Sequence, residues 1–142
     1  RCFTWQSLWK DGRLVAAQGR ERLKWALANR SVSGVTGITG VARISNDPRL
    51  DDIGKRAVYA MEASPNGIFG VDMKENAGGV PCVTEINIGR CFTTIEFFTQ
   101  LGLNFPDLYA RSAMGEDVSA DKVEEGWMWL RSMDAAPKLI RG

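Results

Sequence analysis

Two short apolar segments on either side of a glycine pair constrain the fold of this chain more than any other feature. Residues 67–73 and 83–90 have the composition of β-strands, with acids and an amide at alternating positions. Gly78-Gly79 between them suits a two-residue type I′ turn, which needs positive φ at both central positions. The sequence therefore predicts an antiparallel hairpin whose register decides which polar side chains share a face.

Pairing across that turn sets Ala77 opposite Val80 and, counted outward, Asp72 directly opposite Glu85, with Asn87 on the same face. Two carboxylates that face each other repel, and a divalent cation between them would remove the repulsion. Oxygen ligands of this kind suit Mg²⁺ or Mn²⁺ rather than zinc. The alternative is that each acid simply faces solvent on a sheet packed on one side. Asn87 favours the interpretation as a metal site, because asparagine has poor strand propensity and its presence suggests a requirement on the side chain.

Glu85 and Asn87, followed closely by Arg90, resemble the carboxyl-terminal part of an ATP-grasp domain, most closely the carbamoyl-phosphate synthetase large-subunit type. The likeness includes the acid on the preceding strand and the pattern of residues 97–116. In that family these strand residues bind the magnesium ions that bridge the nucleotide phosphates, and a nearby Arg contacts the phosphates. The resemblance therefore assigns Asp72, Glu85 and Asn87 to the metals. It gives Arg90 a catalytic, ATP-binding role.

One departure from the family pattern is visible. The family commonly has Asn, Pro and Arg in succession, whereas Ile88 and Gly89 separate Asn87 from Arg90 here. The assignment of Arg90 therefore depends on how the chain turns after the strand.

The resemblance implies an α+β fold in which helices pack on a mainly antiparallel sheet, the second lobe of an ATP-grasp domain. Residues 1–116 would form this carboxyl-terminal lobe, and residues 117–142 a tail that ends in a β-hairpin packed on the same domain. The implied enzyme is a ligase that uses ATP and Mg²⁺ to join a small-molecule carboxylate to an amine or ammonia through an acylphosphate. The amino-terminal lobe is a partner in this reading, and the segment alone is expected to perform no reaction.

The first third of the chain predicts a hairpin, a helix and a connector. Residues 2–9 and 13–18 alternate as strands around Asp11-Gly12, a strong hairpin signal. Residues 21–28 predict a short helix whose basic residues could meet a phosphate, although such a row is more often a solvated helix face. Residues 34–40 alternate glycine with hydroxyl and apolar residues, which indicates a flexible connector placed near the acceptor substrate in ATP-grasp relatives.

The rest of the chain predicts three helices and a closing hairpin. Pro48 and the residues before it start a helix, which apolar spacing extends to Met61. A second helix over 95–101 would be capped by Thr93 or Thr94, with Phe97 and Phe98 in the core, and a third would cover 107–114. The two tail strands would place both tryptophans on one face, and they fall on residues 127–130 and 138–140.

Charge and amino-acid composition limit the classes of molecule that this chain is expected to bind. The formal net charge of +1 provides no overall field for nucleic acid or anionic lipid, and no apolar run is long enough to cross a bilayer. Three cysteines without C-x-x-C spacing and the lack of histidine argue against a disulfide framework or structural zinc, which leaves a reducing cytoplasm as the expected location. Without histidine, catalysis would depend on positioning and electrostatics, as phosphoryl transfer does.

Two other functions stay open at this point. A non-catalytic relative could keep the fold as an interaction or regulatory domain, with Trp127 and Trp129 as its contact surface. A magnesium-dependent phosphotransferase with an alcohol acceptor could use the same metal ligands. A homo-oligomer is compatible with all three functions.

Overall fold

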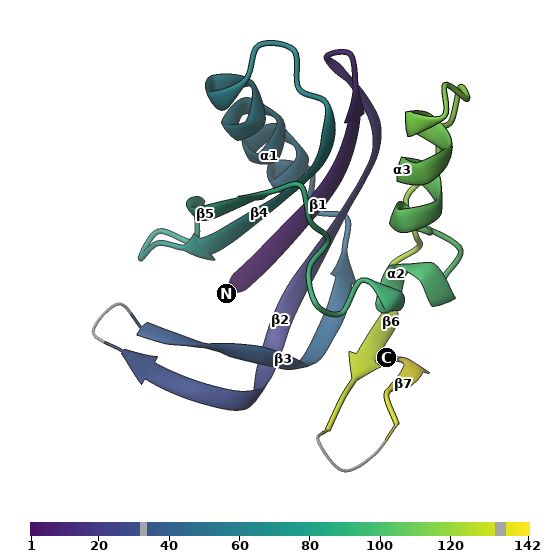
Figure 1. Cartoon of the computed structure of the whole chain (residues 1–142). Helices are drawn as coiled ribbons and strands as arrows, with labels where there is room; N and C mark the ends of the chain where they lie inside the picture. The colour runs from purple at the N-terminus through teal and green to yellow at the C-terminus, as the bar shows by residue number, and fades with distance from the viewer. Residues whose placement is uncertain (32–33, 133–135) are drawn as a thin grey trace.

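A seven-stranded antiparallel sheet forms the centre of the molecule, with strand order β5-β4-β1-β2-β3-β6-β7 (Figure 1). The structure, a computed structural model, describes residues 1–31, 34–132 and 136–142. The predicted α+β class with a mainly antiparallel sheet is confirmed. The strands are β1 (Cys2–Lys10), β2 (Arg13–Ser31), β3 (Gly34–Ser45), β4 (Gly67–Glu75), β5 (Pro81–Ile88), β6 (Trp127–Leu130) and β7 (Lys138–Arg141), and the helices are α1 (Pro48–Met61), α2 (Glu96–Gln100) and α3 (Phe105–Ala113).

The predicted hairpin at the start of the chain is confirmed. Asp11 and Gly12, with φ of 49° and 81°, form the turn between β1 and β2. The strand β1 lies between β2 and β4, and its side chains alternate between the two faces. Phe3 and Trp5 are buried on one face, while Thr4 and Gln6 are buried on the other. At Thr4 and Gln6, one face of β1 therefore carries buried polar side chains in place of apolar core residues.

The predicted helix over 21–28 and the predicted connector over 34–40 are both wrong. Strand β2 continues to Ser31 and pairs with β3 from Gly34 to Ser45, and this long ribbon extends past the rest of the sheet (Figure 1). Register shifts between Arg22 and Leu27 bend it. Pairing with each other satisfies the backbone of both segments, which overrides the local helical spacing of apolar residues.

Helix α1 covers one face of the sheet (Figure 1). It begins as predicted, with the Asp47 side chain accepting a hydrogen bond from the backbone N–H of Arg49 and with Pro48 in the first turn. Gly54 lies directly against the ring of Trp5, where a larger residue would clash. The buried cluster on this face consists of Phe3, Trp5, Trp9, Ala17, Leu50, Val58, Phe69, Val71 and Met73.

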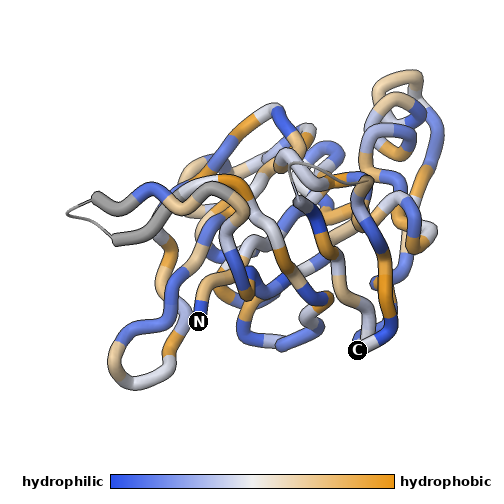
Figure 2. Tube along the Cα trace, turned by 90° about the horizontal axis from the view of Figure 1, so that it is seen from below, coloured by the Kyte–Doolittle hydropathy of each residue, from blue (hydrophilic) through white to orange (hydrophobic). Residues whose placement is uncertain are grey.

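Helices α2 and α3 pack on the opposite face, to which β6 of the same sheet contributes Trp129. Phe97, Phe98, Phe105 and Trp129 are fully or almost fully buried there, which confirms that the predicted aromatic pair is core. The N-cap of α2 is Ile95 without any side-chain hydrogen bond, so the expected threonine cap is wrong. Figure 2 shows hydrophobic and hydrophilic residues alternating along the traces, as expected for strands with differing faces.

Strands β6 and β7 form a hairpin, and β6 pairs with β3. Trp127 and Trp129 both pack on the same core cluster, with Trp129 buried. The segment before β6 is held by Gln18, whose side-chain oxygen accepts a hydrogen bond from the backbone N–H of Val123 at 2.8 Å. Among the described residues, no helix has the length and apolar composition needed to span a bilayer.

Candidate functional site

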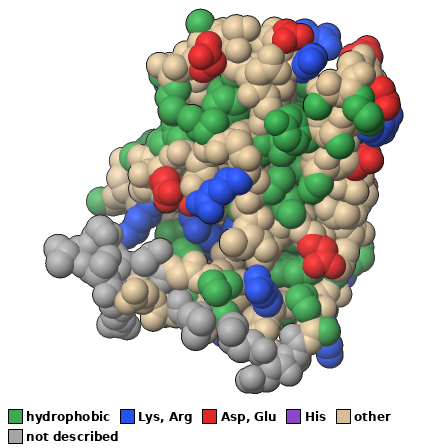
Figure 3. Space-filling model, in the orientation of Figure 1, with side chains coloured by type: hydrophobic (Ala, Val, Ile, Leu, Met, Phe, Trp, Pro, Cys, Tyr) green, Lys and Arg blue, Asp and Glu red, His purple; other side chains and the backbone are tan. Residues whose placement is uncertain are grey.

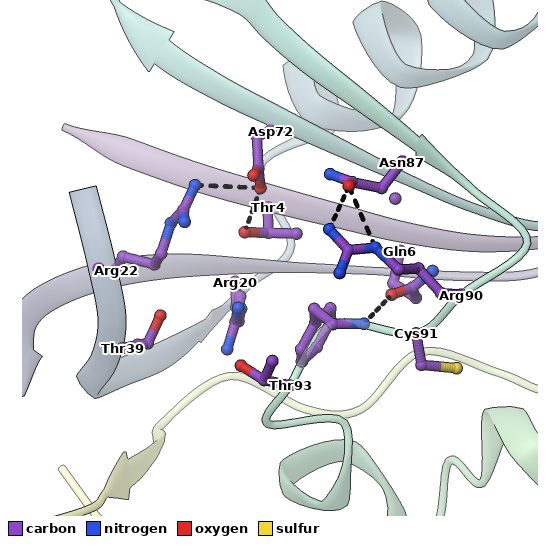
Figure 4. Close-up of a pocket in the computed structure, with 13 residues that line it drawn as sticks. Thr4, Gln6, Arg20, Arg22, Thr39, Asp72, Asn87, Arg90, Cys91 and Thr93 are labelled. Carbon is purple, nitrogen blue, oxygen red and sulfur yellow. Dashed lines mark hydrogen bonds and ion pairs between the residues drawn. The ribbon is translucent and has the colours of Figure 1, made fainter. Parts of the chain in front are cut away.

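A polar cavity of about 120 Å³ lies on this molecule where strands β1 to β5 meet the segment that follows β5 (Figure 4). Strands β1, β2 and β4 form its floor, and the segment that follows β5 closes one side. Its lining residues are Thr4, Gln6, Arg20, Arg22, Gly37, Thr39, Gly70, Asp72, Asn87, Arg90, Cys91, Phe92 and Thr93. In the space-filling view, basic and acidic side chains meet near the middle of this side of the molecule, above the grey tip (Figure 3).

The β4–β5 hairpin pairs Asp72 with Glu85 and Gly70 with Asn87, as predicted. The turn is nevertheless different, because Glu75 pairs with Pro81 and five residues lie between the strands, so the predicted pairing of Ala77 with Val80 is wrong.

Asn76 closes this longer loop. Its side-chain oxygen accepts hydrogen bonds from the backbone N–H groups of Gly78 and Val80 at 2.9 and 3.1 Å. A register shift between Asp72 and Met73 then offsets the extra residue in the turn. The site residues thus keep the expected alignment even though the turn does not.

Asp72 is the acidic group of the cavity. Its Oδ1 accepts a hydrogen bond from Thr4 Oγ1 at 2.8 Å and lies 3.0 Å from Nη2 of Arg22. Both side chains of the ion pair are mostly buried, at 19% and 15% exposure, so solvent screens their attraction only partly. Arg22 thus neutralises Asp72 within the protein. The expected repulsion between Asp72 and Glu85 did not take this arginine into account. Neither contact uses Oδ2.

Arg20 is the most deeply buried charge of the site, with 2% exposure. Its guanidinium lies 3.7 Å from the centre of the Phe92 ring and donates a hydrogen bond to Thr94 Oγ1. Burial, and secondarily the charge of Arg22, lower the pKa of Arg20 to about 9, so the group is still protonated at neutral pH.

The Nε atoms of Arg20 and Arg22 are buried and have no hydrogen-bond partner among the described residues. A buried donor without a partner costs about 1–3 kcal/mol, and more when it is charged. Arg22 also lies 4.9 Å from the centre of the Trp25 ring, which shields its other side. The cavity is therefore lined by guanidinium groups whose hydrogen-bonding capacity the protein leaves partly unused.

Arg90 reaches the cavity from the segment after β5. Gly89 takes a φ of 75°, in the left-handed region, and its N–H donates to the carbonyl of Ile68 at 2.8 Å. This turn brings the exposed Arg90 back to Asn87, whose Oδ1 accepts a hydrogen bond from Arg90 Nε at 3.2 Å (Figure 4). The two residues that separate Asn87 from Arg90 in the sequence thus do not separate their side chains.

Gln6 fixes the segment that follows β5. Its Nε2 donates to the carbonyl of Phe69 at 3.0 Å, and its Oε1 accepts from the backbone N–H of Phe92 at 3.0 Å. Both side-chain ends are satisfied inside the protein, which gives the Phe92 ring a defined position against Arg20. A glutamine in an apolar strand is the sequence signal that could have indicated this role.

The structure brings together three of the four residues predicted for the site. Asp72, Asn87 and Arg90 line the cavity, whereas Glu85 pairs with Asp72 across the strands but is exposed and is not among the lining residues. Arg20 and Arg22 were expected on the basic face of a helix, where contact with a phosphate was the less favoured alternative to solvent, and the helical assignment of 21–28 concealed their strand. Their spacing of two residues, which puts both on one face of a strand, was the available signal.

The donor set fits a hard divalent cation. Among the described residues, no three His, Cys, Asp or Glu side chains are close enough to hold a metal ion by themselves. Mg²⁺ does not require such a group, because it is usually held by one or two carboxylates together with substrate phosphates and water. Asp72 and Glu85 on paired strands, with the amide of Asn87 beside them, supply oxygens of this kind, of which Asp72 Oδ1 is paired with Arg22 and Asn87 Oδ1 with Arg90 in this structure.

No protein-family model matches the sequence, and no curated protein sequence matches it. A solved structure described as that of "a putative ATP-grasp superfamily protein from Archaeoglobus fulgidus" matches with a TM-score of 0.59 at 19% sequence identity. The match covers 99% of this chain and 44% of that chain, so this chain spans less than half of the length of that protein. At this identity the likeness shows the fold, which is the ATP-grasp-like α+β arrangement expected from the sequence.

Proposed function

We propose that this chain forms the carboxyl-terminal lobe of an ATP- and magnesium-dependent ATP-grasp ligase, similar to the carbamoyl-phosphate synthetase large subunit. The observation that carries the proposal is the β4–β5 register, which aligns Asp72, Glu85 and Asn87 on one face beside Arg90. The fold match to an ATP-grasp superfamily protein supports it. The reaction would join a carboxylate to an amine or ammonia.

The chemistry has two steps. A substrate carboxylate oxygen attacks the terminal phosphorus of ATP, the bond from that phosphorus to the bridging oxygen breaks, and ADP leaves. The amine or ammonia nitrogen then attacks the carbonyl carbon of the acylphosphate, phosphate leaves, and the nitrogen loses a proton. Both steps depend on charge neutralisation and alignment more than on a general base, which suits a chain without histidine.

Each predicted residue has a separate task in this proposal. Asp72, Glu85 and Asn87 would hold Mg²⁺, which when bound offsets the negative charge of the phosphate oxygens. Arg90 would donate charge-assisted hydrogen bonds to the same oxygens. Its contact with Asn87 supports this task, because the amide oxygen keeps the exposed guanidinium at the cavity. A cytoplasmic location is part of the proposal, and all three cysteines are free, as that location requires.

The test replaces Glu85 by alanine in a protein that contains both lobes. We expect ATP turnover to fall by about 100-fold or more, since a metal ion supplies several kcal/mol of transition-state stabilisation. Thermal unfolding should hardly change, because Glu85 is exposed. Binding of Mn²⁺ in the presence of ADP, followed by electron paramagnetic resonance, gives a second readout that does not depend on turnover.

Glu124→Ala is the matched control, because it removes another exposed glutamate outside the site. Equal turnover and equal Mn²⁺ binding in Glu85→Ala and in the parent would refute the metal assignment. Product analysis separates the ligase from a phosphotransferase, since only the ligase forms a carbon–nitrogen bond at the carboxylate carbon.

A further inference from the structure

The cavity is too small for a nucleotide but large enough for a single anionic group. Pockets that bury cofactors and drug-sized ligands typically enclose about 300–1,000 Å³. This cavity encloses about 120 Å³. Its occupant is therefore a small ion or the end of a larger molecule that stays outside.

The charges that line the cavity favour an anion. Arg20, Arg22 and Arg90 contribute three positive charges and Asp72 contributes one negative charge, which leaves an excess of two. Arg22 is paired directly with Asp72, whereas Arg20 forms no direct ion pair among the described residues and feels the charge of Asp72 only at longer range. Burying an unpaired cation is costly, and a bound anion would remove that cost.

The unused donors are arranged for an oxyanion. Arg20 has one face of its guanidinium covered by Phe92 and one nitrogen occupied by Thr94, so its remaining donors lie along the edge of the group. Its Nε, like that of Arg22, is buried without a partner. Figure 4 shows the two arginines in one ring of side chains with Asp72 and Thr39. Guanidinium edges match the planar or tetrahedral oxygens of carboxylate and phosphate.

We propose that Arg20 and Arg22 form a binding site for a small oxyanion, a carboxylate or a phosphate group, within this cavity. The site shares its cavity with Asp72 and Asn87, and Arg22 is paired with Asp72, so it adjoins the proposed metal ligands. The inference rests on the proposed function and adds the residues that would hold an anionic group there. Its test uses neither nucleotide nor Mg²⁺, so its failure is distinguishable from failure of the metal assignment.

The direct test titrates the protein with inorganic phosphate and, separately, with acetate, without nucleotide or magnesium. Nitrogen-resolved NMR follows the arginine Nε–H signals. We expect the signals of Arg20 and Arg22 to shift together and to saturate with one of the probes, while the signal of the exposed Arg13 on the same strand stays unchanged. Saturation by phosphate identifies a phosphoryl group as the natural occupant, and saturation by acetate alone identifies a carboxylate.

Substitution provides the second measurement. Arg20→Gln and Arg20→Lys should each weaken binding of the effective probe by about tenfold or more, because each loses a charge-assisted hydrogen bond from the guanidinium edge. Arg13→Gln is the control, with the same loss of charge on β2 but outside the cavity. If neither probe shifts the two signals in the unmodified protein, the proposal is refuted, and this readout does not depend on whether any variant folds. Equal affinities in the Arg20 variants and the Arg13 control would also refute it.

Discussion

Gly54 shows how much of this fold depends on one side chain being absent. It lies in α1, where a Cβ atom would come within 2.4 Å of the Trp5 ring. That ring is fully buried, and its Nε1 donates a hydrogen bond to Asp51 at 2.8 Å, so it has little freedom to move away. The close approach of α1 to β1 therefore requires glycine at this position.

We expect Gly54→Ala to destabilise the protein although alanine is the better helix former. The clash should cost about 1–3 kcal/mol as overpacking, which exceeds the gain of about 1 kcal/mol from helix propensity. Denaturant unfolding measures the difference. Gly78→Ala is the control, because Gly78 is exposed and a Cβ there meets only the Asn76 side chain, at 3.4 Å. A Gly54→Ala variant more stable than the parent would contradict the packing argument.

Strand β2 illustrates why an element can be misjudged from its own sequence. Its first half was predicted because Asp11-Gly12 fixes the hairpin locally. Its second half owes its structure to β3, with which it pairs up to Ser31 and Gly34. The alternation that results places Arg20 and Arg22 in the cavity and Glu21 on the opposite face. Strand structure that depends on pairing with another segment leaves little trace in a short window of sequence.

Glu21 of β2 forms ion pairs with Arg1, which precedes β1, and with Arg43 of β3, on the side away from the cavity. Its carboxylate accepts hydrogen bonds from Arg1 Nε at 2.9 Å and from Arg43 Nε at 2.8 Å. Burial alone would raise the pKa of Glu21, but the hydrogen bonds and charges of the two arginines outweigh it and hold the pKa below its ordinary value. The stabilisation is therefore present above the pKa of the unfolded state and is lost as the pH falls through the folded-state pKa.

Glu21→Gln should lower the free energy of unfolding at neutral pH by about 1–3 kcal/mol, since charge-assisted hydrogen bonds are lost. The variant should also lose less stability than the parent between neutral and acidic pH, because the titrating group is gone. Urea unfolding across this pH range measures both effects. Glu116→Gln, which breaks an exposed pair with Arg111, should change stability far less than Glu21→Gln, because solvent screens that pair. Parallel pH profiles for Glu21→Gln and the parent would contradict the linkage.

The whole molecule consists of one sheet with a buried cluster on each face, and the carboxyl-terminal hairpin contributes to one of them. Trp129 of β6 lies 5.8 Å from Phe97 of α2, ring centre to ring centre, in a stacked arrangement. The same strand pairs with β3. The boundary predicted at residues 116 and 117 remains a prediction, and unfolding experiments can test whether the tail is part of the same cooperative unit.

Trp129→Ala should destabilise the entire protein by about 3–5 kcal/mol in a single transition, because it opens a cavity in a cluster shared with α2 and α3. Trp129→Phe should cost far less. Its indole Nε1 is buried without a partner among the described residues, so phenylalanine removes an unsatisfied donor while it keeps most of the apolar area. Circular dichroism and tryptophan fluorescence should report coincident transitions. A separate early transition for the tail would show that it folds independently.

The sequence predicted the β1–β2, β4–β5 and β6–β7 hairpins, α1 and the alignment of Asp72 with Glu85, because turn residues, helix caps and strand alternation act over short distances. It did not predict that Arg22 would neutralise Asp72, because β3 and α1 separate β2, which carries Arg22, from β4 in the sequence. The residues that line the cavity come from strands far apart in the sequence, so only the sheet topology brings them together.

The register shift between Asp72 and Met73 has a consequence for how this protein tolerates change. A sheet normally transmits the insertion or loss of one loop residue along the whole strand and reverses every side chain. Here the irregularity lies between the loop and the site, so it absorbs the mismatch before it reaches Glu85 and Asn87. The tip of this hairpin can therefore vary in length during evolution, or be engineered, while the ligands beyond the irregularity keep their places.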